Sequence, residues 1–439
     1  MRKTALAVAV GGLFIAPAAQ AQIVFGNETL GTVQFYGKLY PEFGYGSSTG
    51  ATQPGTTVSN LVTGTASTTL GGGPVANPQA RRDVDAQNSY LGFRGERNLI
   101  GGLKAIWQVE QSVELDSGGT AGTGGTGSTA GTFSNRNSFL GLRHGTFGTV
   151  KLGRMDSIYK EYGDTFQMFG ISSGNFVSAS NVLSNIGVNS GSAVNRAARF
   201  HERFSNSLQY EAAQFAGFTA GVQYVPDEAR GEAKASPFAT APAGTDQHVW
   251  SYGVKWDSRL FYASVHQEQH FDFFGGSSAA AAGLANNATT GAHSRDIATR
   301  FSGEWRFMPD ARITLDVSNL RYREYGQAAG IRFERYQHNT WAVGWDQGFG
   351  GPLRFAVQYV RGNEGSCSLT GGVACSTTGL YGYMLNGGVR YRFDRQTFVF
   401  LIASKLWNGP SARYDNWSAG DPARGGEIVQ TAIGLSYVF

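Results

Sequence analysis

The sequence predicts an all-β protein, a 16-stranded antiparallel transmembrane β-barrel. Three observations favour this fold: a carboxy-terminal stretch of alternating residue types, a series of strand-like segments joined in turn by long and short connections, and no helix-forming segment long enough to cover an apolar sheet face. An uncovered apolar face needs lipid as its partner. A sheet in lipid must close into a barrel, because every backbone N–H and C=O there needs a partner.

The carboxy-terminal stretch, residues 426–439, carries the clearest alternation. One face has Val429, Thr431, Ile433, Leu435, Tyr437 and Phe439, and the other has Gln430, Ala432, Gly434, Ser436 and Val438. Alternation with a period of two is typical of a half-buried strand. We interpret this segment as the strand that closes the barrel.

Residues 1–21 have the features of a secretory signal peptide. Arg2 and Lys3 precede an uncharged stretch, and Ala19-Gln20-Ala21 forms a small-residue cleavage site before Gln22. The alternative is a transmembrane anchor, but the apolar run is shorter than the ~20 residues that a spanning helix needs. Loss of Arg2 and Lys3 leaves 34 basic against 32 acidic residues, so net charge says little about partners.

The composition favours a single domain. Only 15% of the residues are charged, against ~25% in an average globular protein. No linker or shift in composition divides the chain, and barrels often run long as single units. We therefore predict one transmembrane β-barrel over residues 22–439.

Sixteen segments have the character of strands. They lie near residues 32–44, 87–97, 102–115, 134–144, 147–155, 198–212, 215–226, 246–257, 259–272, 294–308, 310–324, 335–349, 352–363, 379–393, 396–408 and 425–439. Eight long connections alternate with seven short ones, and the long ones are 45–86, 116–133, 156–197, 227–245, 273–293, 325–334, 364–378 and 409–424. This alternation is the outer-membrane pattern of short periplasmic turns and longer external loops.

The two faces of the clearer strands differ in polarity. In the first segment, Val33, Phe35 and Leu39 oppose Gln34, Tyr36, Lys38, Tyr40 and Glu42; in the third, Leu103, Ala105, Trp107 and Val109 oppose Lys104, Gln108 and Glu110. Sixteen strands enclose a space too wide for side chains to fill, so a polar lining predicts a water-filled lumen. Tyr437, Phe439, Trp305, Trp341 and Trp407 lie toward segment ends, where aromatic girdles are expected, although ordinary packing would also explain each of them.

The long connection at about 156–197 is richer in apolar residues than the others. It contains Tyr159, Tyr162, Phe166, Met168, Phe169, Ile171, Phe176 and Val177. We expect it to fold into the lumen as a constriction loop, with the acids Asp156, Glu161 and Asp164 facing basic groups of the opposite wall. An external lid or a subunit contact is the alternative.

The chain has two cysteines, Cys367 and Cys375, in a segment rich in Gly, Ser and Thr. In an oxidising compartment this spacing favours a local disulfide. Free thiols are the alternative, and two sulfurs without a nearby histidine make a poor metal site.

Several motifs resemble the Gram-negative general porins, especially the beta-proteobacterial type. They are Ser89-Tyr-Leu-Gly-Phe-Arg-Gly-Glu96, Gly101-Gly-Leu-Lys-Ala-Ile-Trp-Gln-Val-Glu110, Arg136-Asn-Ser-Phe-Leu-Gly-Leu142, Phe147-Gly-Thr-Val-Lys-Leu-Gly-Arg154 and Arg203-Phe-Ser-Asn-Ser-Leu-Gln-Tyr210. The resemblance covers the mature chain and is strongest before residue 225 and in the last strand. It implies a homotrimer in the outer-membrane lipid, a third external loop folded inward as the constriction, and a second loop, here about 116–133, that reaches a neighbouring subunit. Phe439 is similar to the family's assembly signal.

The resemblance also implies constriction residues. Lys38, Arg136 and Arg203 match basic wall positions of the family, and Arg94 and Lys151 add to the basic side. Tyr90 departs from the family, since it stands where such porins usually carry an arginine. Tyr40 stands where the beta-proteobacterial type usually has an acid, with Glu42 two residues on. Glu110 is expected to line the pore as well.

The parity of the fourth strand is ambiguous. If Leu140 and Leu142 face lipid, alternation turns Arg136 outward; if Phe139 faces lipid, Arg136 turns inward. An arginine facing lipid costs ~2–4 kcal/mol at the bilayer midplane, which favours the inward choice.

Together these features predict an outer-membrane porin of a Gram-negative bacterium, a channel for passive diffusion of small hydrophilic solutes and ions with a weak anion preference. The alternatives are a substrate-selective porin, a barrel-embedded hydrolase and a non-conducting adhesin. No serine lies in a G-x-S-x-G context, so the enzyme is the less favoured class. We expect no cofactor, no metal and no nucleic-acid partner.

Overall fold

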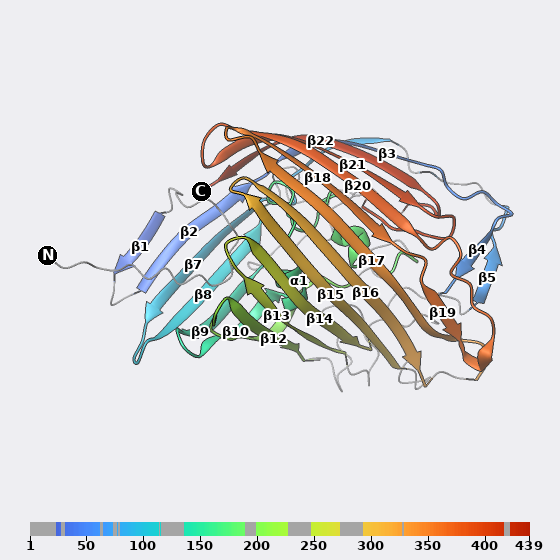
Figure 1. Cartoon of the computed structure of the whole chain (residues 1–439), viewed down its shortest axis with the longest axis horizontal. Coiled ribbons are helices and arrows are strands. Elements are labelled where there is room, and N and C mark those ends of the chain that lie inside the picture. The colour runs from blue at the N-terminus through green and yellow to red at the C-terminus, as the bar shows by residue number, and fades with distance from the viewer. Residues whose placement is uncertain are drawn as a thin grey trace.

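In the computed structural model, eighteen strands form one closed antiparallel ring (Figure 1). They are β2 (Gly31–Leu39), β3 (Glu42–Thr49), β6 (Arg81–Asp85), β7 (Tyr90–Asn98), β8 (Leu103–Ser112), β9 (Ser138–His144), β10 (Gly148–Asp156), β11 (Arg203–Glu211), β12 (Phe218–Val225), β13 (His248–Asp257), β14 (Phe261–Phe271), β15 (His293–Met308), β16 (Ala311–Tyr325), β17 (Phe333–Gly348), β18 (Leu353–Gly362), β20 (Gly382–Arg392), β21 (Thr397–Asn408) and β22 (Glu427–Val438). The ring has sixteen strand positions, here called staves, because two of the positions hold two strands each. The described residues are 23–27, 31–61, 65–72, 77, 80–113, 115, 136–188, 199–226, 247–272, 293–326, 329–416 and 422–439. The predicted signal peptide and the second long loop lie outside them.

Two staves are broken, which the sequence did not indicate. β2 and β3 follow one another along one stave, and β6 and β7 along the next: β2 pairs with β7, β3 pairs with β6, and both β2 and β3 pair with β22. The break in the first stave falls at Tyr40 and Pro41, because proline has no N–H to donate to a ladder. The pairing of β22 with β2 and β3 closes the ring, as the alternation at 426–439 predicted.

The described residues hold seven shorter elements outside the staves. They are β1 (Ile23–Asn27), paired with β2; β4 (Thr57–Asn60) and β5 (Thr65–Thr69), which form a hairpin; β19 (Ser366–Leu369), paired with β17; and the helical turns α1 (Ile158–Gly163), α2 (Ser180–Leu183) and η1 (Thr370–Gly372). The prediction that 45–86 is wholly a loop is wrong, since it holds the end of β3, the β4–β5 hairpin and β6. In the described part of the chain, the helices are all too short to cross a bilayer.

The outer face of the ring is apolar and bounded by two aromatic girdles. On β22, Val429, Ile433, Leu435 and Tyr437 are exposed, whereas Ile428, Gln430, Ala432 and Ser436 between them are buried. Toward the end with long connections, the loop end, neighbouring rings contact one another in series. The centroid distances are 5.2 Å for Trp341 and Tyr359, 6.3 Å for Tyr359 and Tyr383, and 4.9 Å for Tyr383 and Trp407. Toward the opposite turn end, Trp345 meets Phe355 and Tyr391 meets Phe393. Such girdles mark the two membrane interfaces.

Phe439 completes the ring at the turn end. Its N–H donates to the Gly37 carbonyl (3.0 Å), and its carbonyl accepts from the Gly37 N–H (2.9 Å). Its ring lies against Phe35 and Tyr437. The last residue is therefore part of the ladder that joins the two ends of the sheet.

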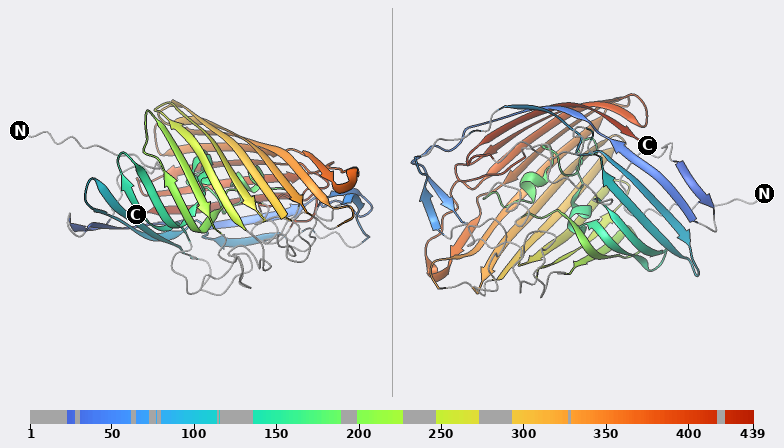
Figure 2. Two further views of the ribbon diagram at one scale, coloured as in Figure 1. Left: turned by 90° about the horizontal axis from the view of Figure 1, so that it is seen from below. Right: turned by 180° about the vertical axis from the view of Figure 1, so that it is seen from behind.

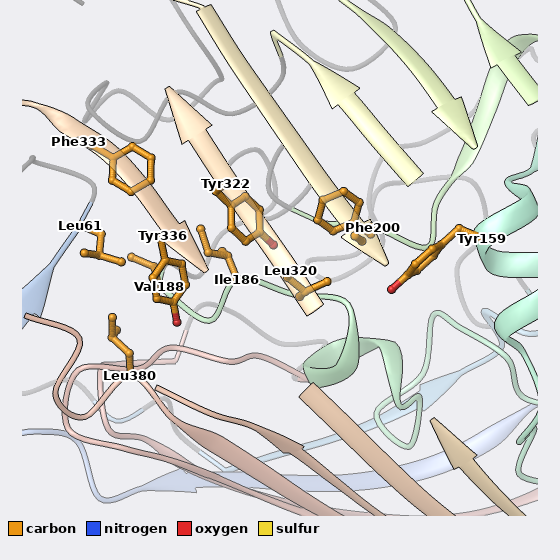
Figure 3. Close-up of a cluster of buried hydrophobic side chains, with 11 residues drawn as sticks. Leu61, Tyr159, Ile186, Val188, Phe200, Leu320, Tyr322, Phe333, Tyr336 and Leu380 are labelled. Carbon is orange, nitrogen blue, oxygen red and sulfur yellow. The ribbon is translucent and has the colours of Figure 1, made fainter. Parts of the chain in front are cut away.

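The buried apolar clusters lie inside the ring, between the inward faces of the strands and residues 158–188 with Phe200 (Figure 3). The two helical turns of this segment, α1 and α2, lie within the ring of strands in Figure 2. In the cluster of Figure 3, Tyr159, Ile186, Val188 and Phe200 pack against inward residues of β16 and β17 and against Leu61 and Leu380. The apolar side chains of residues 158–188 are therefore buried against the inner wall of the barrel.

Cys367 and Cys375 are joined in a disulfide, with their Cα atoms 5.7 Å apart. They pack beside the cluster that contains Tyr336 and Leu380, and β19 pairs with the loop end of β17. The bridge lies within the long connection 364–378 and does not join two staves of the ring.

We therefore expect Cys367→Ser/Cys375→Ser to leave the barrel folded and to loosen residues 364–378 locally. Limited proteolysis should cut this connection faster in the variant, while the heat-modifiable mobility of the barrel on a gel stays unchanged. Loss of the compact form would mean that the bridge supports the ring itself.

Candidate functional site

Residues 157–188 cross the interior of the ring from one wall to the other. At the first wall, the Ser157 hydroxyl caps α1 by accepting from the Lys160 N–H (3.1 Å). The Tyr159 N–H donates to the Ser251 hydroxyl of β13 (2.8 Å), and the Tyr262 hydroxyl of β14 donates to the Tyr162 carbonyl (2.7 Å). Helix α1 is therefore held by inward polar side chains.

The far part of the segment reaches the opposite wall. The Asn175 amide donates to Glu42 of β3 (2.7 Å), and the Asn386 amide of β20 donates to the Val177 carbonyl (2.9 Å). Lys38 of β2 donates to the Gly170 carbonyl (3.1 Å). These contacts tie the segment to strands on both sides of the closure at β22.

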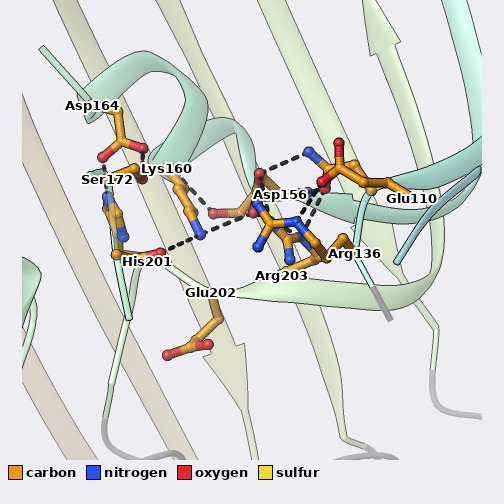
Figure 4. A network of polar contacts seen from close by, with 12 residues as sticks. Glu110, Arg136, Asp156, Lys160, Asp164, Ser172, His201, Glu202 and Arg203 are labelled. Atoms are coloured by element: carbon orange, nitrogen blue, oxygen red, sulfur yellow. Dashed lines mark hydrogen bonds and ion pairs between the residues drawn. The ribbon is translucent and has the colours of Figure 1, made fainter. Parts of the chain in front are cut away.

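A network of charges lies where the segment leaves β10 (Figure 4). Asp156 pairs with Arg203 (3.1 Å) and with Lys160 (3.0 Å), which lies four residues further on the first turn of α1. The Asn137 amide oxygen accepts from Arg203 (2.8 Å), and its NH2 group donates to Asp156 (2.8 Å). Asp156 is thus held by three neighbours in one place.

The second half of the network lies on β8. Arg136 pairs with Glu110 (2.5 Å), and the Tyr36 hydroxyl donates to the other oxygen of Glu110 (3.0 Å). The Arg136 guanidinium also lies over the Tyr90 ring, 4.7 Å from its centroid. Tyr90, which departs from the family pattern, therefore supports an arginine from the neighbouring segment instead of supplying one.

The ammonium group of Lys38, on β2, contacts a backbone carbonyl and the faces of two aromatic rings. Besides the Gly170 carbonyl, its Nζ lies 4.8 Å from the Tyr40 ring centroid and 5.7 Å from that of Tyr90. Cation–π contacts of this kind hold an ammonium in place without cancelling its charge. Arg94 lies further toward the turn end, where it donates to Gln34 (2.5 Å) and covers the Tyr36 ring.

The acids of the segment have partners near their own anchorage. Glu161 accepts from Gln209 (3.1 Å) and lies 4.0 Å from Lys151, and burial raises the pKa of its carboxyl despite this neighbour. Asp164 contacts His201 (2.6 Å) and the Ser172 hydroxyl. Burial opposes its ionisation, but the attraction of His201, together with these hydrogen bonds, keeps its pKa below the usual range. We expected Asp156, Glu161 and Asp164 to face basic groups on the opposite wall. In the structure their charged partners instead lie close to where the segment leaves and rejoins the barrel wall.

The structure resolves the parity of the fourth strand. Leu140 and Leu142 are 64% and 48% exposed on the outer face, so the prediction that Phe139 faces lipid is wrong. Lys151 lies over the Phe139 ring inside the barrel. Arg136 nevertheless points inward, because β9 begins only at Ser138 and the chain bends before it. Strand alternation does not extend to a residue outside the strand.

Sequence reasoning missed three residues that hold this site. Lys160 has a detectable signal, since it stands four residues after Asp156 where α1 makes such pairs adjacent. Asn137 and His201 have none, because their partners Asp156 and Asp164 are distant in sequence and come close only through the fold of the segment. In the part of the chain that the structure describes, His, Cys, Asp and Glu side chains form no group of three able to hold a metal ion.

Comparison with known proteins places these features in a family. A family model described as Gram-negative porin matches residues 4–401. The chain is similar to the major outer membrane protein P.IA of Neisseria meningitidis serogroup C (29% identity over 191 residues, 44% of this chain and 42% of that protein) and to P.IB of Neisseria lactamica (34% over 159 residues, 36% and 40%). The matched part spans less than half the length of these relatives.

The fold is similar to that of a solved structure, an anion-selective porin from Comamonas acidovorans. The TM-score is 0.63 with 16% sequence identity, and the match covers 93% of this chain and 100% of the other. At this identity the likeness concerns the fold alone.

Proposed function

The chain belongs to the Gram-negative porin family of outer-membrane proteins, and from this premise we propose that it forms a water-filled channel for passive diffusion of small hydrophilic solutes and ions, with a weak anion preference. The single observation that carries the proposal is the closed ring with an apolar outside, with many polar and charged side chains on its inside, and with residues 157–188 crossing it. A barrel of sixteen strands leaves an aqueous space. The segment that crosses it would set the width of the aperture.

The balance of charge at the crossing supports the sign of the preference. Six basic residues stand against five carboxylates there: Lys38, Arg94, Arg136, Lys151, Lys160 and Arg203 against Glu42, Glu110, Asp156, Glu161 and Asp164. A narrow opening in low-dielectric walls concentrates the field of such fixed charges.

The proposal extends to assembly and chemistry. By family resemblance the working unit is a homotrimer of separate channels, with Phe439 as part of the signal that brings the chain to the outer membrane. Solutes would pass without a catalytic step or a cofactor. The polar crossing would admit hydrated solutes and disfavour apolar ones, since transfer of an apolar solute into a polar, charged aperture gains no burial.

Reversal potentials in a planar bilayer under a KCl gradient test the function and its sign. We expect the wild type to prefer chloride weakly and Lys38→Gln to lower the chloride-to-potassium permeability ratio by roughly twofold or more, because a charge at the aperture acts over a short distance in a weakly screening medium. Arg97→Gln is the matched control: it removes the same charge from an exposed position near the turn after β7 and should leave the ratio unchanged.

Purified protein that never conducts would refute the channel. A clear cation preference of the wild type would refute only the sign of the selectivity. Equal chloride-to-potassium permeability ratios in the wild type and Lys38→Gln would show that Lys38 does not act at the aperture. A saturable, solute-specific current would instead identify a substrate-selective porin.

A further inference from the structure

Four arginines lie together on the outside of the barrel at the loop end of β15, β16 and β17, strands that run side by side in Figure 1. Arg295 is directly opposite Arg323, and Arg323 is directly opposite Arg335, so three guanidinium groups stand in one row across three strands. Arg321 lies two residues nearer the apolar band. All four side chains are exposed, and the residues between them point inward and are buried. We call these four residues the outer arginine surface.

This arrangement is unfavourable unless an anion is present. Like charges directly opposite one another on neighbouring strands destabilise a sheet. Arg295 donates to the neutral Gln269 (2.8 Å) and covers the Phe271 ring, 5.2 Å from its centroid. Within the residues that the structure describes, Arg321, Arg323 and Arg335 make no ion pair with a carboxylate. Among the residues that the structure describes, the positive charge of the row therefore has no carboxylate as counter-ion.

The surface has a fixed depth relative to the membrane. Arg295, Arg323 and Arg335 each lie six residues beyond an apolar row formed by Phe301, Val317 and Trp341. Six residues span about 20 Å along a tilted strand. Trp341 belongs to the aromatic girdle of the loop end, so the arginines stand beyond the hydrocarbon, at the level of the head groups of the outer leaflet.

A hollow in the outer face lies between the apolar band and the arginines. Its volume is about 470 Å³, and its lining includes the apolar row and a polar row formed by Thr299, Asn319 and Asn339. The polar row is directly paired across the three strands, and the Asn319 amide donates to Asn339 (2.8 Å). From the apolar band toward the loop end, the outer face therefore carries three successive zones. The first is apolar, the second has amide and hydroxyl groups, and the third has guanidinium groups.

We propose that the outer arginine surface and this hollow bind a phosphorylated glycolipid of the outer leaflet. Its acyl chains would lie on the apolar row, its sugar hydroxyls and amides would meet Thr299, Asn319 and Asn339, and its phosphates would meet the arginines. Guanidinium groups suit phosphate because they bind it with paired N–H donors. A free phosphate ion would use only the last of the three zones. The inference needs the outer-membrane location but not the channel function, so the two can fail separately.

Native mass spectrometry of the protein, refolded without lipid in detergent, tests the proposal. The probes are diphosphorylated lipid A, the same lipid without its phosphates, and inorganic phosphate. We expect the wild type to retain the diphosphorylated lipid and Arg321→Gln/Arg323→Gln/Arg335→Gln to bind it at least about tenfold more weakly, since each basic residue near a membrane surface adds to the binding of anionic lipid.

Arg97→Gln/Arg259→Gln/Arg395→Gln is the matched control, because it removes three exposed arginines at or beside the short turns. It should bind the lipid as the wild type does. If the first triple variant fails to reach the compact, heat-modifiable form, Arg323→Gln alone carries the test, since Arg323 is opposed by an arginine on each side. We expect a loss of about threefold for it.

Equal binding of the diphosphorylated lipid by the wild type and Arg321→Gln/Arg323→Gln/Arg335→Gln would overturn the proposal. Equal retention of the dephosphorylated lipid would overturn the role of the phosphates. Displacement of the lipid by an equal concentration of inorganic phosphate would make the surface a site for a soluble anion, and would overturn the part assigned to the hollow.

Discussion

Arg300→Met is expected to lower the free energy of unfolding by about 3–5 kcal/mol, the cost of leaving the partner of a buried ion pair unpaired. Arg300 of β15 pairs with Asp316 of β16 at 2.8 Å, and their side chains are 4% and 2% exposed. The same guanidinium donates to the Gly163 carbonyl at the end of α1 (2.6 Å). One residue therefore links two staves to the segment that crosses the lumen, and its loss leaves a buried carboxylate without its cation.

Urea unfolding in detergent, followed by tryptophan fluorescence, measures this effect. Arg321→Met is the matched control, because it makes the same replacement on the exposed face of the adjoining strand, where surface substitutions change stability by about 0.5 kcal/mol or less. Arg300→Met/Asp316→Leu should recover much of the loss, since removing both charges leaves no unpaired ion. A change below about 1 kcal/mol in Arg300→Met would mean that water reaches Asp316 and screens it.

The ring could be predicted from the sequence because its signals are local. The alternation along Val429, Thr431 and Ile433 requires no knowledge of the partner strand, and lipid on one side with water on the other forces it. The order of long and short connections then fixes which strands are neighbours. The break at Tyr40 and Pro41 was not predicted from the sequence. Both β2 and β3 are regular strands by themselves, and proline is compatible with the end of a strand.

The site was less predictable because its contacts are distant in sequence. Asp156 was identified as an acid of the crossing segment, but its bond to Asn137 and its pair with Arg203 depend on how β9, β10 and β11 are aligned. A sequence shows which charges exist and not which of them meet. The row of Arg295, Arg323 and Arg335 is a similar case: three separate strands carry it, and only the strand register brings the charges together.

Removal of the crossing segment should have the largest effect on conduction. Replacing residues 165–187 by a short Gly-Ser linker keeps α1 and deletes the part that reaches Glu42, Lys38 and Asn386. We expect single-channel conductance to rise roughly twofold or more, because the width of the opening limits flow. The anion preference should fall at the same time, since the aperture charges would then act across a wider aqueous space. Unchanged conductance would mean that the segment does not limit the opening.

A pair of glycines gives a graded version of the same experiment. A Cβ atom at Gly344 of β17 would overlap the Phe166 ring, whereas at Gly387 of β20 it would meet open space. Gly344→Leu should therefore push Phe166 off the wall and cost about 1–3 kcal/mol, the usual penalty for overpacking. Its conductance should lie between those of the wild type and the deletion variant, with more frequent fluctuations. Gly387→Leu makes the same replacement in another strand and should behave as the wild type, because nothing has to move. If both variants behave alike, docking of Phe166 does not control the opening, and the remaining contacts at Gly170 and Val177 hold the segment without it.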